Sequence, residues 1–210
     1  MNAPQWLVKL AAAASELDAG PLRLPPDGVG RPSAVLILFG CEDEQTGPDL
    51  LLIQRSDDLR LHAGQPAFPG GAIDAGDAGP VAAALREAAE ETGLEPGGVD
   101  VVGVLPELFI PRTGFRVVPV LAWWRQPSAV APVDAGEVAA VARIPVTELA
   151  DPAVRVMATA PGGYASPAFR VRGMLIWGFT ALLIDRLLAF GGWEVPWDHS
   201  VTVDAVSRSR

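Results

Sequence analysis

The sequence has one cysteine, few basic residues and no long uninterrupted apolar segment. Cys41 alone can build neither a disulfide framework nor a zinc cluster, so a reducing cytoplasm is expected. With 16 Lys and Arg against 25 Asp and Glu, the net charge of −9 argues against a nucleic-acid partner. The most apolar segment, residues 173–190, is interrupted by Asp185 and Arg186 and is short for a membrane span. We therefore expect a soluble protein without a membrane partner.

The N-terminus also lacks a basic region followed by a long apolar run, so no secretory signal is expected. A length of 210 residues, half of them hydrophobic, allows one domain with a sizeable core. We expect an N-terminal helix and linker over residues 1–32, a main domain over 33–192 and a tail over 193–210 that frays. The acidic balance leaves small phosphorylated substrates open, because a metal ion and local arginines can supply positive charge.

The hydrophobic pattern predicts several strands, a hairpin and helices near both ends. Helices are expected over residues 4–17 and 177–190, and a hairpin over 164–175. Pro119 suggests that its strand lies at a sheet edge or carries a bulge. The expected strands cover residues 33–39, 49–54, 99–105, 115–124 and 138–144. This pattern alone indicates an α/β or α+β fold.

Residues 70–94 read as a glycine loop followed by a helix. Pro80 suits the first helical position and Gly93 the stop. At about 100° per residue, Glu87, Glu90 and Glu91 share roughly a third of the helix circumference. Apolar residues, namely Val81, Leu85 and Ala88, cluster on another side and are expected to pack.

Like charges at this spacing destabilise a helix by a few tenths of a kcal/mol per pair. A hard divalent cation such as Mg²⁺ or Mn²⁺ would turn that repulsion into a binding site. For the three glutamates alone, a solvated acidic patch is the simpler interpretation. The adjacent glycine loop and Arg86 favour a metal site.

With both features in view, the stretch resembles the Nudix box. Gly71 supplies its start, and residues 86–94, Arg-Glu-Ala-Ala-Glu-Glu-Thr-Gly-Leu, fit its second half at every fixed position. Asp77 stands where the pattern has Glu, and eight residues instead of seven separate it from Arg86. The extra residue falls before the helix or in its first turn, so the phase of the glutamates is kept, but any role for Asp77 becomes doubtful.

The stretch before the box is more specific. Residues 51–71, LLIQRSDDLRLHAGQPAFPGG, resemble the extended signature of coenzyme A pyrophosphatases, and residues 177–181, WGFTA, resemble a second element of that subfamily. The resemblance covers about residues 33–188. It implies the Nudix α/β/α sandwich with a mixed sheet. It also implies metal-dependent hydrolysis of coenzyme A or acyl-CoA to 3′,5′-ADP and (acyl-)4′-phosphopantetheine.

The resemblance and the chemistry together suggest roles for individual residues. Arginine donors match phosphate oxygens, so arginines of the loops are candidate substrate ligands. Substrate binding is expected from Arg55, Arg60, His62, Arg112, Gly70 and Gly71. Catalysis is expected from Arg86, which orients a glutamate, with Glu87, Glu91 and Glu137. The metal set is Glu87, Glu90 and Glu91, and the general base is left open between Glu87 and Glu137.

Two other functions compete with this interpretation. The first keeps the Nudix fold but changes the substrate to ADP-ribose, NADH or an oxidised nucleoside triphosphate. The second is a Nudix domain that senses a nucleotide without hydrolysing it. A homodimer is an open option, since the sequence does not reveal the oligomeric state.

Overall fold

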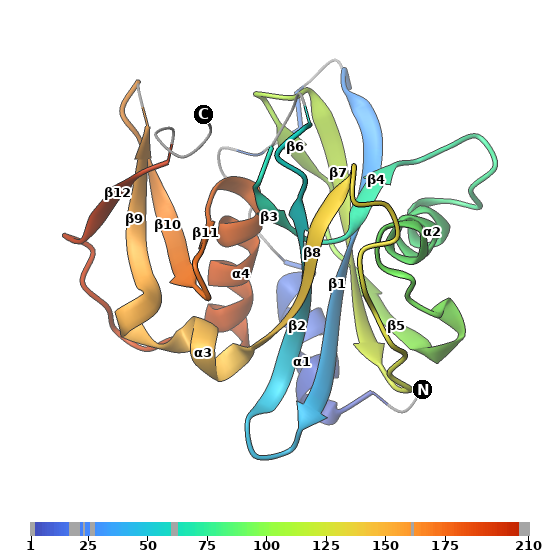
Figure 1. Cartoon of the computed structure of the whole chain (residues 1–210), viewed down its shortest axis with the longest axis horizontal. Helices are drawn as coiled ribbons and strands as arrows, with labels where there is room; N and C mark the ends of the chain where they lie inside the picture. The colour runs from blue at the N-terminus through green and yellow to red at the C-terminus, as the bar shows by residue number, and fades with distance from the viewer. Residues whose placement is uncertain are drawn as a thin grey trace. The chain divides into compact units, whose positions relative to one another are not determined.

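The computed structural model describes residues 3–16, 22, 24–25, 28–59, 63–160 and 162–205 (Figure 1). The chain forms two compact units. Met1–Gly40 and Phe68–Val133 make up the first, and Cys41–Ala67 and Asp134–Arg210 make up the second. Among the described residues, no helix combines the length and the apolar character that crossing a membrane requires.

The sheet of the first unit is mixed, as predicted. β1 (Arg31–Asp43), whose last three residues belong to the second unit, runs parallel to β7 (Phe115–Trp124). β4 (Gly70–Ala72) pairs antiparallel with β1. β5 (Val99–Val104) and β6 (Leu108–Ile110) pair antiparallel with β7, which therefore lies in the middle. The 3₁₀ turn η2 (Pro96–Gly98) leads into β5.

Both faces of this sheet are covered. Phe39 and Trp123 are register partners on β1 and β7. Their rings contact the ring of Trp6, in α1 (Gln5–Ala14), edge-on, with centroids 5.4 and 6.2 Å away. Leu38 and Ala122 point to the other face and are also fully buried. α2 (Pro80–Thr92) contacts β4 and β7. Helices therefore accompany a mixed sheet, in line with the predicted α/β/α sandwich.

Pro119 corrects one prediction. Its strand, β7, is central, so the expected edge position is wrong. The carbonyl of Pro119 accepts the N–H of Leu105, just after β5 ends, so its missing N–H falls on that same side of the strand. The parallel ladder to β1 therefore loses nothing there. A register shift between Val101 and Gly103 lies in the neighbouring strand β5.

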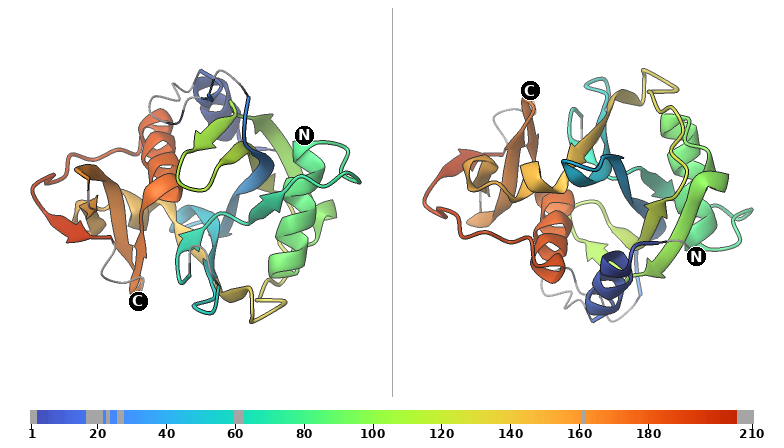
Figure 2. Two further views of the ribbon diagram at one scale, coloured as in Figure 1. Left: turned by 90° about the horizontal axis from the view of Figure 1, so that it is seen from above. Right: turned by 90° about the horizontal axis from the view of Figure 1, so that it is seen from below.

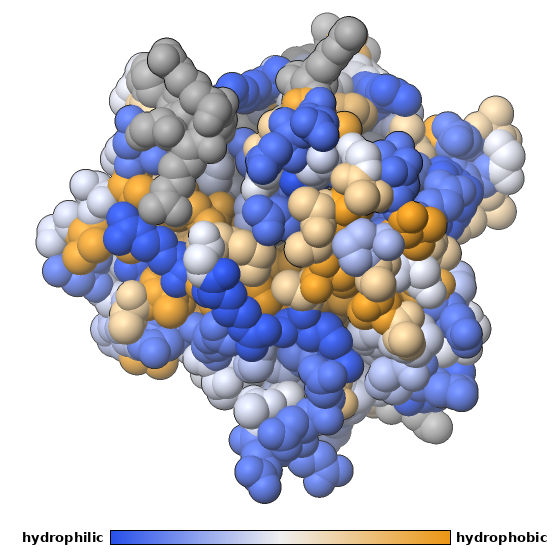
Figure 3. All heavy atoms as spheres, in the orientation of Figure 1, coloured by the Kyte–Doolittle hydropathy of each residue, from blue (hydrophilic) through white to orange (hydrophobic). Residues whose placement is uncertain are grey.

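The second unit contains two groups of strands. β2 (Gly47–Arg55) pairs antiparallel with β8 (Val138–Pro145) and with β3 (Pro66–Ala67), and α3 (Val146–Ala150) packs on β2 and β8. The turn over residues 44–46 carries hydrophilic residues at the bottom of the view in Figure 3. The bidentate pair of Arg143 with Asp49, at 2.9 and 2.7 Å, ties β8 to β2.

The other group is a four-stranded sheet in the order β11-β10-β9-β12. It comprises β9 (Arg155–Ala160), β10 (Tyr164–Val171), β11 (Met174–Ile176) and β12 (Thr202–Asp204), with η3 (Pro152–Val154) before β9. α4 (Gly178–Gly191) packs on β10. The predicted hairpin around Arg172 and Gly173 is confirmed, and both residues have positive φ.

Two segments of this sheet were not expected from the sequence. β9 was not predicted, and the tail beyond residue 192 was expected to fray. Instead, β12 pairs in parallel with β9, and Ala205 donates its N–H to the carbonyl of Thr159. Val203 packs on an apolar cluster that includes Val156 and Ala158. As far as residue 205 the tail is held, because Val203 and Ala205 add to this small core.

Candidate active site

α2 begins and ends where its sequence predicts. Pro80 takes the first position, where its missing N–H is not needed. Gly93 ends the helix in the left-handed conformation, with φ 70°, and donates its N–H to Ala89. The loop between β4 and α2 projects from the first unit in all the views of Figures 1 and 2. The box residues all belong to the first unit and lie on β4, on the loop after it and on α2.

The buried face of α2 differs from the predicted one. Val81 and Leu85 are only partly buried, and the buried set is Ala83, Ala84, Ala88, Glu91 and Thr92. Glu91 follows Ala88 by three residues and Ala84 by seven, so helical geometry puts it on the packed face. Glu91 is 7% exposed, so the interpretation of the three glutamates as a solvated acidic patch does not hold for this residue.

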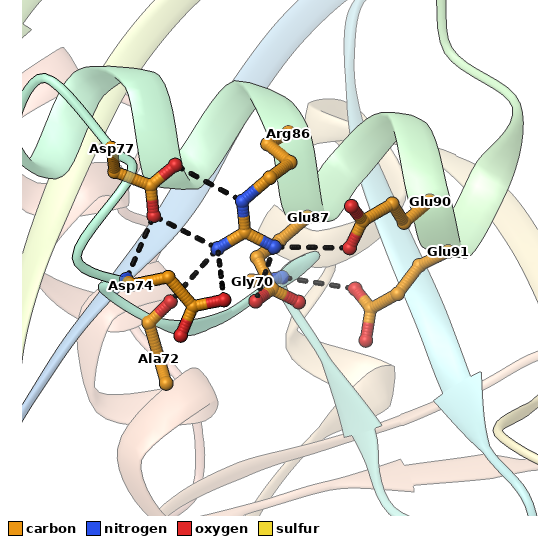
Figure 4. A network of polar contacts seen from close by, with 8 residues as sticks. All are labelled: Gly70, Ala72, Asp74, Asp77, Arg86, Glu87, Glu90 and Glu91. Carbon is orange, nitrogen blue, oxygen red and sulfur yellow. Dashed lines mark hydrogen bonds and ion pairs between the residues drawn. The ribbon is translucent and has the colours of Figure 1, made fainter.

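Arg86 gathers the acidic residues of the box (Figure 4). Its Nε and Nη2 donate to the two carboxylate oxygens of Asp77, each at 3.0 Å. Its Nη1 donates to Glu87 and to Glu90, again at 3.0 Å each. Nη2 also donates to the carbonyl of Ala72 at 3.0 Å. One guanidinium thus links the end of β4, the loop and two helical glutamates.

Asp77 is the residue whose role the sequence left in doubt. Its carboxylate also accepts the N–H of Asp74 at 2.8 Å, while its own N–H donates to the carbonyl of Asp74 at 3.0 Å. This small turn accommodates the extra residue of the loop and presents Asp77 to Arg86. The contact could not be predicted from spacing alone, since the spacing departs from the box pattern. The only sequence signal for it was the presence of an acid in that loop.

The two glycines bring the backbone close to the glutamates. The N–H of Gly70 donates to Oε2 of Glu91 at 2.9 Å. A Cβ on Gly70 would overlap the carbonyl of Ala34, and a Cβ on Gly71 would overlap the carboxylate of Glu87. Only glycine permits the close approach of β4 to β1 at Gly70, whereas a Cβ on Gly71 would force the end of the Glu87 side chain to shift. The sequence therefore needs glycine at both positions for the glutamates to be held as they are.

Electrostatics in the cluster follow from these contacts. The hydrogen bonds from Arg86 lower the pKa of Asp77 below its ordinary value of 3.8. The same contact raises the pKa of Arg86, which stays charged. Burial raises the pKa of the Glu87 carboxyl above its ordinary value, although Arg86 acts in the opposite direction. Arg86 therefore offsets the mutual repulsion of carboxylates that the helix brings together.

The donor set suits a hard divalent cation in its chemistry. All three glutamate side chains offer carboxylate oxygens, the ligands that Mg²⁺ and Mn²⁺ prefer. The side chains are nevertheless turned to protein partners: Glu87 and Glu90 to Arg86, and Glu91 to Gly70. Over the described ranges, no group of three or more His, Cys, Asp or Glu side chains is already gathered as a metal site. The residues fit the ion, and at least one side chain must reorient to take it.

The remaining predicted site residues lie in several places. Arg112 belongs to the first unit and is exposed in the turn between β6 and β7. Arg55, at the end of β2, and Glu137, exposed just before β8, belong to the second unit, where Glu137 accepts the N–H of Ser56 through its backbone carbonyl. Arg60 and His62 lie outside the described residues. The box residues come together within one unit, and the substrate-binding predictions stay predictions.

The chain matches known proteins of one family. A family model for the NUDIX domain matches residues 30–160, more than half of the chain. A protein of Citrobacter koseri named "Uncharacterized Nudix hydrolase NudL" is 60% identical over 74 residues, which are 35% of this chain and 38% of that protein. The protein of the same name from Cronobacter sakazakii is 50% identical over 101 residues, 48% of this chain and 52% of that one. The chain thus spans between about a third and a half of the length of these curated relatives.

Solved structures support the fold. RenU, a Nudix hydrolase of M. smegmatis, aligns over 80% of this chain and 90% of its own, with a TM-score of 0.54 and 20% identity. A Nudix hydrolase of Alicyclobacillus acidocaldarius aligns over 76% of this chain and 91% of its own, with a TM-score of 0.50 and 17% identity. At these identities the likeness concerns the fold alone. Taken with the family model and the box geometry, it leads to one conclusion: the chain is a member of the Nudix family and has the Nudix fold.

Proposed function

We propose that the protein is a metal-dependent Nudix hydrolase that cleaves the diphosphate bridge of coenzyme A or an acyl-CoA. Water would attack one phosphorus atom of the bridge, the P–O bond to the bridging oxygen would break, and two phosphate monoesters would leave. These products are 3′,5′-ADP and (acyl-)4′-phosphopantetheine. The observation that carries the proposal is the box geometry: Arg86 and the N–H of Gly70 hold three glutamates of α2, and Gly71 leaves room for Glu87.

Glu87, Glu90 and Glu91 would hold the metal ion. Mg²⁺ or Mn²⁺ supplies Lewis-acid stabilisation of phosphoryl charge and lowers the pKa of bound water. The protein's own part is to orient the carboxylates. Arg86 does so for Glu87 and Glu90, and the N–H of Gly70 does so for Glu91. Glu87 and Glu137 both remain candidates for the general base.

Coenzyme A as the substrate rests on the resemblance of residues 51–71 and 177–181 to coenzyme A pyrophosphatases. Coenzyme A carries a diphosphate and a separate 3′-phosphate, so its enzyme needs cationic donors beyond the metal ion. Arg55, Arg60 and Arg112, with His62, are the proposed donors. The single cysteine is compatible with work in a reducing cytoplasm, which we propose as the compartment.

The test is product identification by mass spectrometry after incubation with coenzyme A and Mg²⁺ or Mn²⁺. Formation of 3′,5′-ADP and 4′-phosphopantetheine is expected. A parallel panel of ADP-ribose, NADH and oxidised nucleoside triphosphates would reveal a different Nudix substrate if turnover there were faster. Binding of a nucleotide in Mn²⁺ without any turnover would contradict hydrolysis and support a sensing domain.

A further inference from the structure

We infer that Arg86 acts as a built-in counter-cation of the proposed metal site. When a divalent cation binds, Glu90 is the carboxylate that breaks its ion pair with Arg86. The inference deepens the proposed function and rests on it. It concerns which of the three glutamate side chains are already fixed in the metal-free protein and which one moves when the cation binds. It also gives Arg86 a second effect: besides positioning Glu87, Arg86 opposes metal binding.

The first observation is the sharing of one nitrogen. Nη1 of Arg86 lies 3.0 Å from Glu87 and 3.0 Å from Glu90, so it bridges two carboxylates that would otherwise repel each other. The rest of the guanidinium is fixed by Asp77, which accepts from Nε and Nη2. The positive charge is therefore anchored from behind and projects between the two glutamates.

The second observation is a graded exposure of the three glutamates. Glu91 is 7% exposed and accepts the N–H of Gly70. The side chain of Glu87 is 18% exposed and lies under Gly71, where no Cβ would fit. The side chain of Glu90 is 60% exposed and reaches Arg86 from one helical turn away. Glu90 can move without disturbing packing, whereas movement of the other two would.

Competition between charges follows from this geometry. Exposed ion pairs contribute little to stability, so Glu90 can leave Arg86 at small cost. The guanidinium stays on Asp77, and its charge then faces any cation held by the glutamates. Two like unit charges a few ångströms apart repel appreciably even in water, and a divalent ion doubles the effect. Arg86 therefore stabilises the metal-free cluster and weakens cation binding.

The test compares Arg86→Gln with Arg116→Gln in the full chain. Arg116 is a matched control in the same unit, since it makes a bidentate pair with Glu107 at 3.0 and 3.1 Å and reaches a backbone carbonyl, as Arg86 does. The Kd for Mn²⁺ is measured by electron paramagnetic resonance. Arg86→Gln is expected to bind Mn²⁺ about tenfold more tightly than wild type. Arg116→Gln should leave the Kd unchanged.

The outcomes separate the inference from the proposed function. Wild-type protein that binds no Mn²⁺ would overturn both. Wild-type binding that becomes weaker or stays equal in Arg86→Gln would overturn the counter-cation alone and leave the hydrolase proposal standing. Arg86→Lys retains the charge and should keep a near wild-type Kd, whereas a Kd as tight as that of Arg86→Gln would contradict a charge effect.

A measurement on the wild-type protein does not depend on the folding of any variant. The Nε–H of Arg86 should keep its nuclear magnetic resonance shift and slow exchange when Mg²⁺ is added, because Asp77 still accepts it. The Nη1 hydrogens, released by Glu90, should shift and exchange faster. Loss of the protected Nε–H on Mg²⁺ addition would contradict an anchored counter-cation.

Discussion

Arg86 in the first unit and Arg155 in the second show two opposite uses of an arginine. All three guanidinium nitrogens of Arg86 donate to oxygens, mainly carboxylates, and its side chain is 28% exposed. Arg155 has a side chain that is 0% exposed and pairs with the carboxylate of Asp185. Within the described part of the chain, its Nε and Nη1 have no hydrogen-bond partner.

The guanidinium group of Arg155 is held largely by contacts with aromatic rings. Its guanidinium carbon lies 4.8 Å from the ring centroid of Phe169 and 4.6 Å from that of Trp197, and the Trp197 ring stacks on His199. Burial lowers the pKa of Arg155 and raises that of Asp185, in opposition to their mutual attraction. The difference shows that Arg86 positions the carboxylates of the proposed site, whereas Arg155 is buried and stacks against aromatic rings.

The largest effect is expected from the carboxylates that Arg86 organises. Glu91→Gln and Glu90→Gln should each lower kcat by about a thousandfold or more, because each removes a charge from the proposed metal site. Circular dichroism should show a retained fold. Glu107→Gln, which breaks the bidentate pair to Arg116, is the control and should keep its turnover. Near-normal rates for both box variants at saturating metal would refute the metal assignment.

Arg155 should instead matter for stability. Arg155→Met leaves the partly buried Asp185 without its partner and should lower the free energy of unfolding by up to about 3–5 kcal/mol. The double variant Arg155→Met with Asp185→Leu should recover most of that loss, since it replaces the pair by apolar groups. Denaturant unfolding followed by tryptophan fluorescence measures both. A double variant no more stable than the single one would show that the pair itself stabilises the core.

In the first unit, the sequence predicted features set by neighbouring residues better than contacts between segments that are distant in the chain. The ends of α2 were predictable because Pro80 and Gly93 act within a turn of their own positions. The burial of Glu91 was not, because it depends on the backbone of Gly70, brought in by a separate strand. The central strand β7 tolerates Pro119 because β5 ends opposite it, which no single-strand pattern reveals. Arg155 attracted no prediction because its aromatic neighbours come from two distant segments.

Three arginines other than Arg86 and Arg155 are the proposed ligands of the substrate's phosphates, and their variants test this role. If Arg55, Arg60 or Arg112 contacts the 3′-phosphate, its replacement by alanine should remove about 1.5–3 kcal/mol of interaction. kcat/KM should then fall for coenzyme A and much less for dephospho-coenzyme A. Arg125, exposed and paired with Asp100, is the control. Equal losses on both substrates for all three variants would exclude a 3′-phosphate contact while leaving diphosphate hydrolysis intact.

The smallest expected effect is a pH dependence of stability at Asp77. The pKa of Asp77 is lower in the folded protein than its ordinary value of 3.8, chiefly through Arg86. A depressed carboxyl pKa contributes stability that is present above the unfolded pKa and is lost as the pH falls through the folded pKa. Asp77→Asn should therefore lower Tm at pH 7, and its difference from wild type should shrink as the pH falls below about 4.

Asp198 in the second unit supplies the matched comparison for Asp77. Hydrogen bonds from Ser200 lower the pKa of Asp198 as well, so Asp198→Asn should show the same shape of Tm difference against pH. Only Asp77→Asn should also reduce turnover, because only Asp77 fixes the arginine that holds Glu87 and Glu90. A Tm difference for Asp77→Asn that stays constant from pH 7 to pH 3 would mean that Asp77 acts through shape and not through its charge.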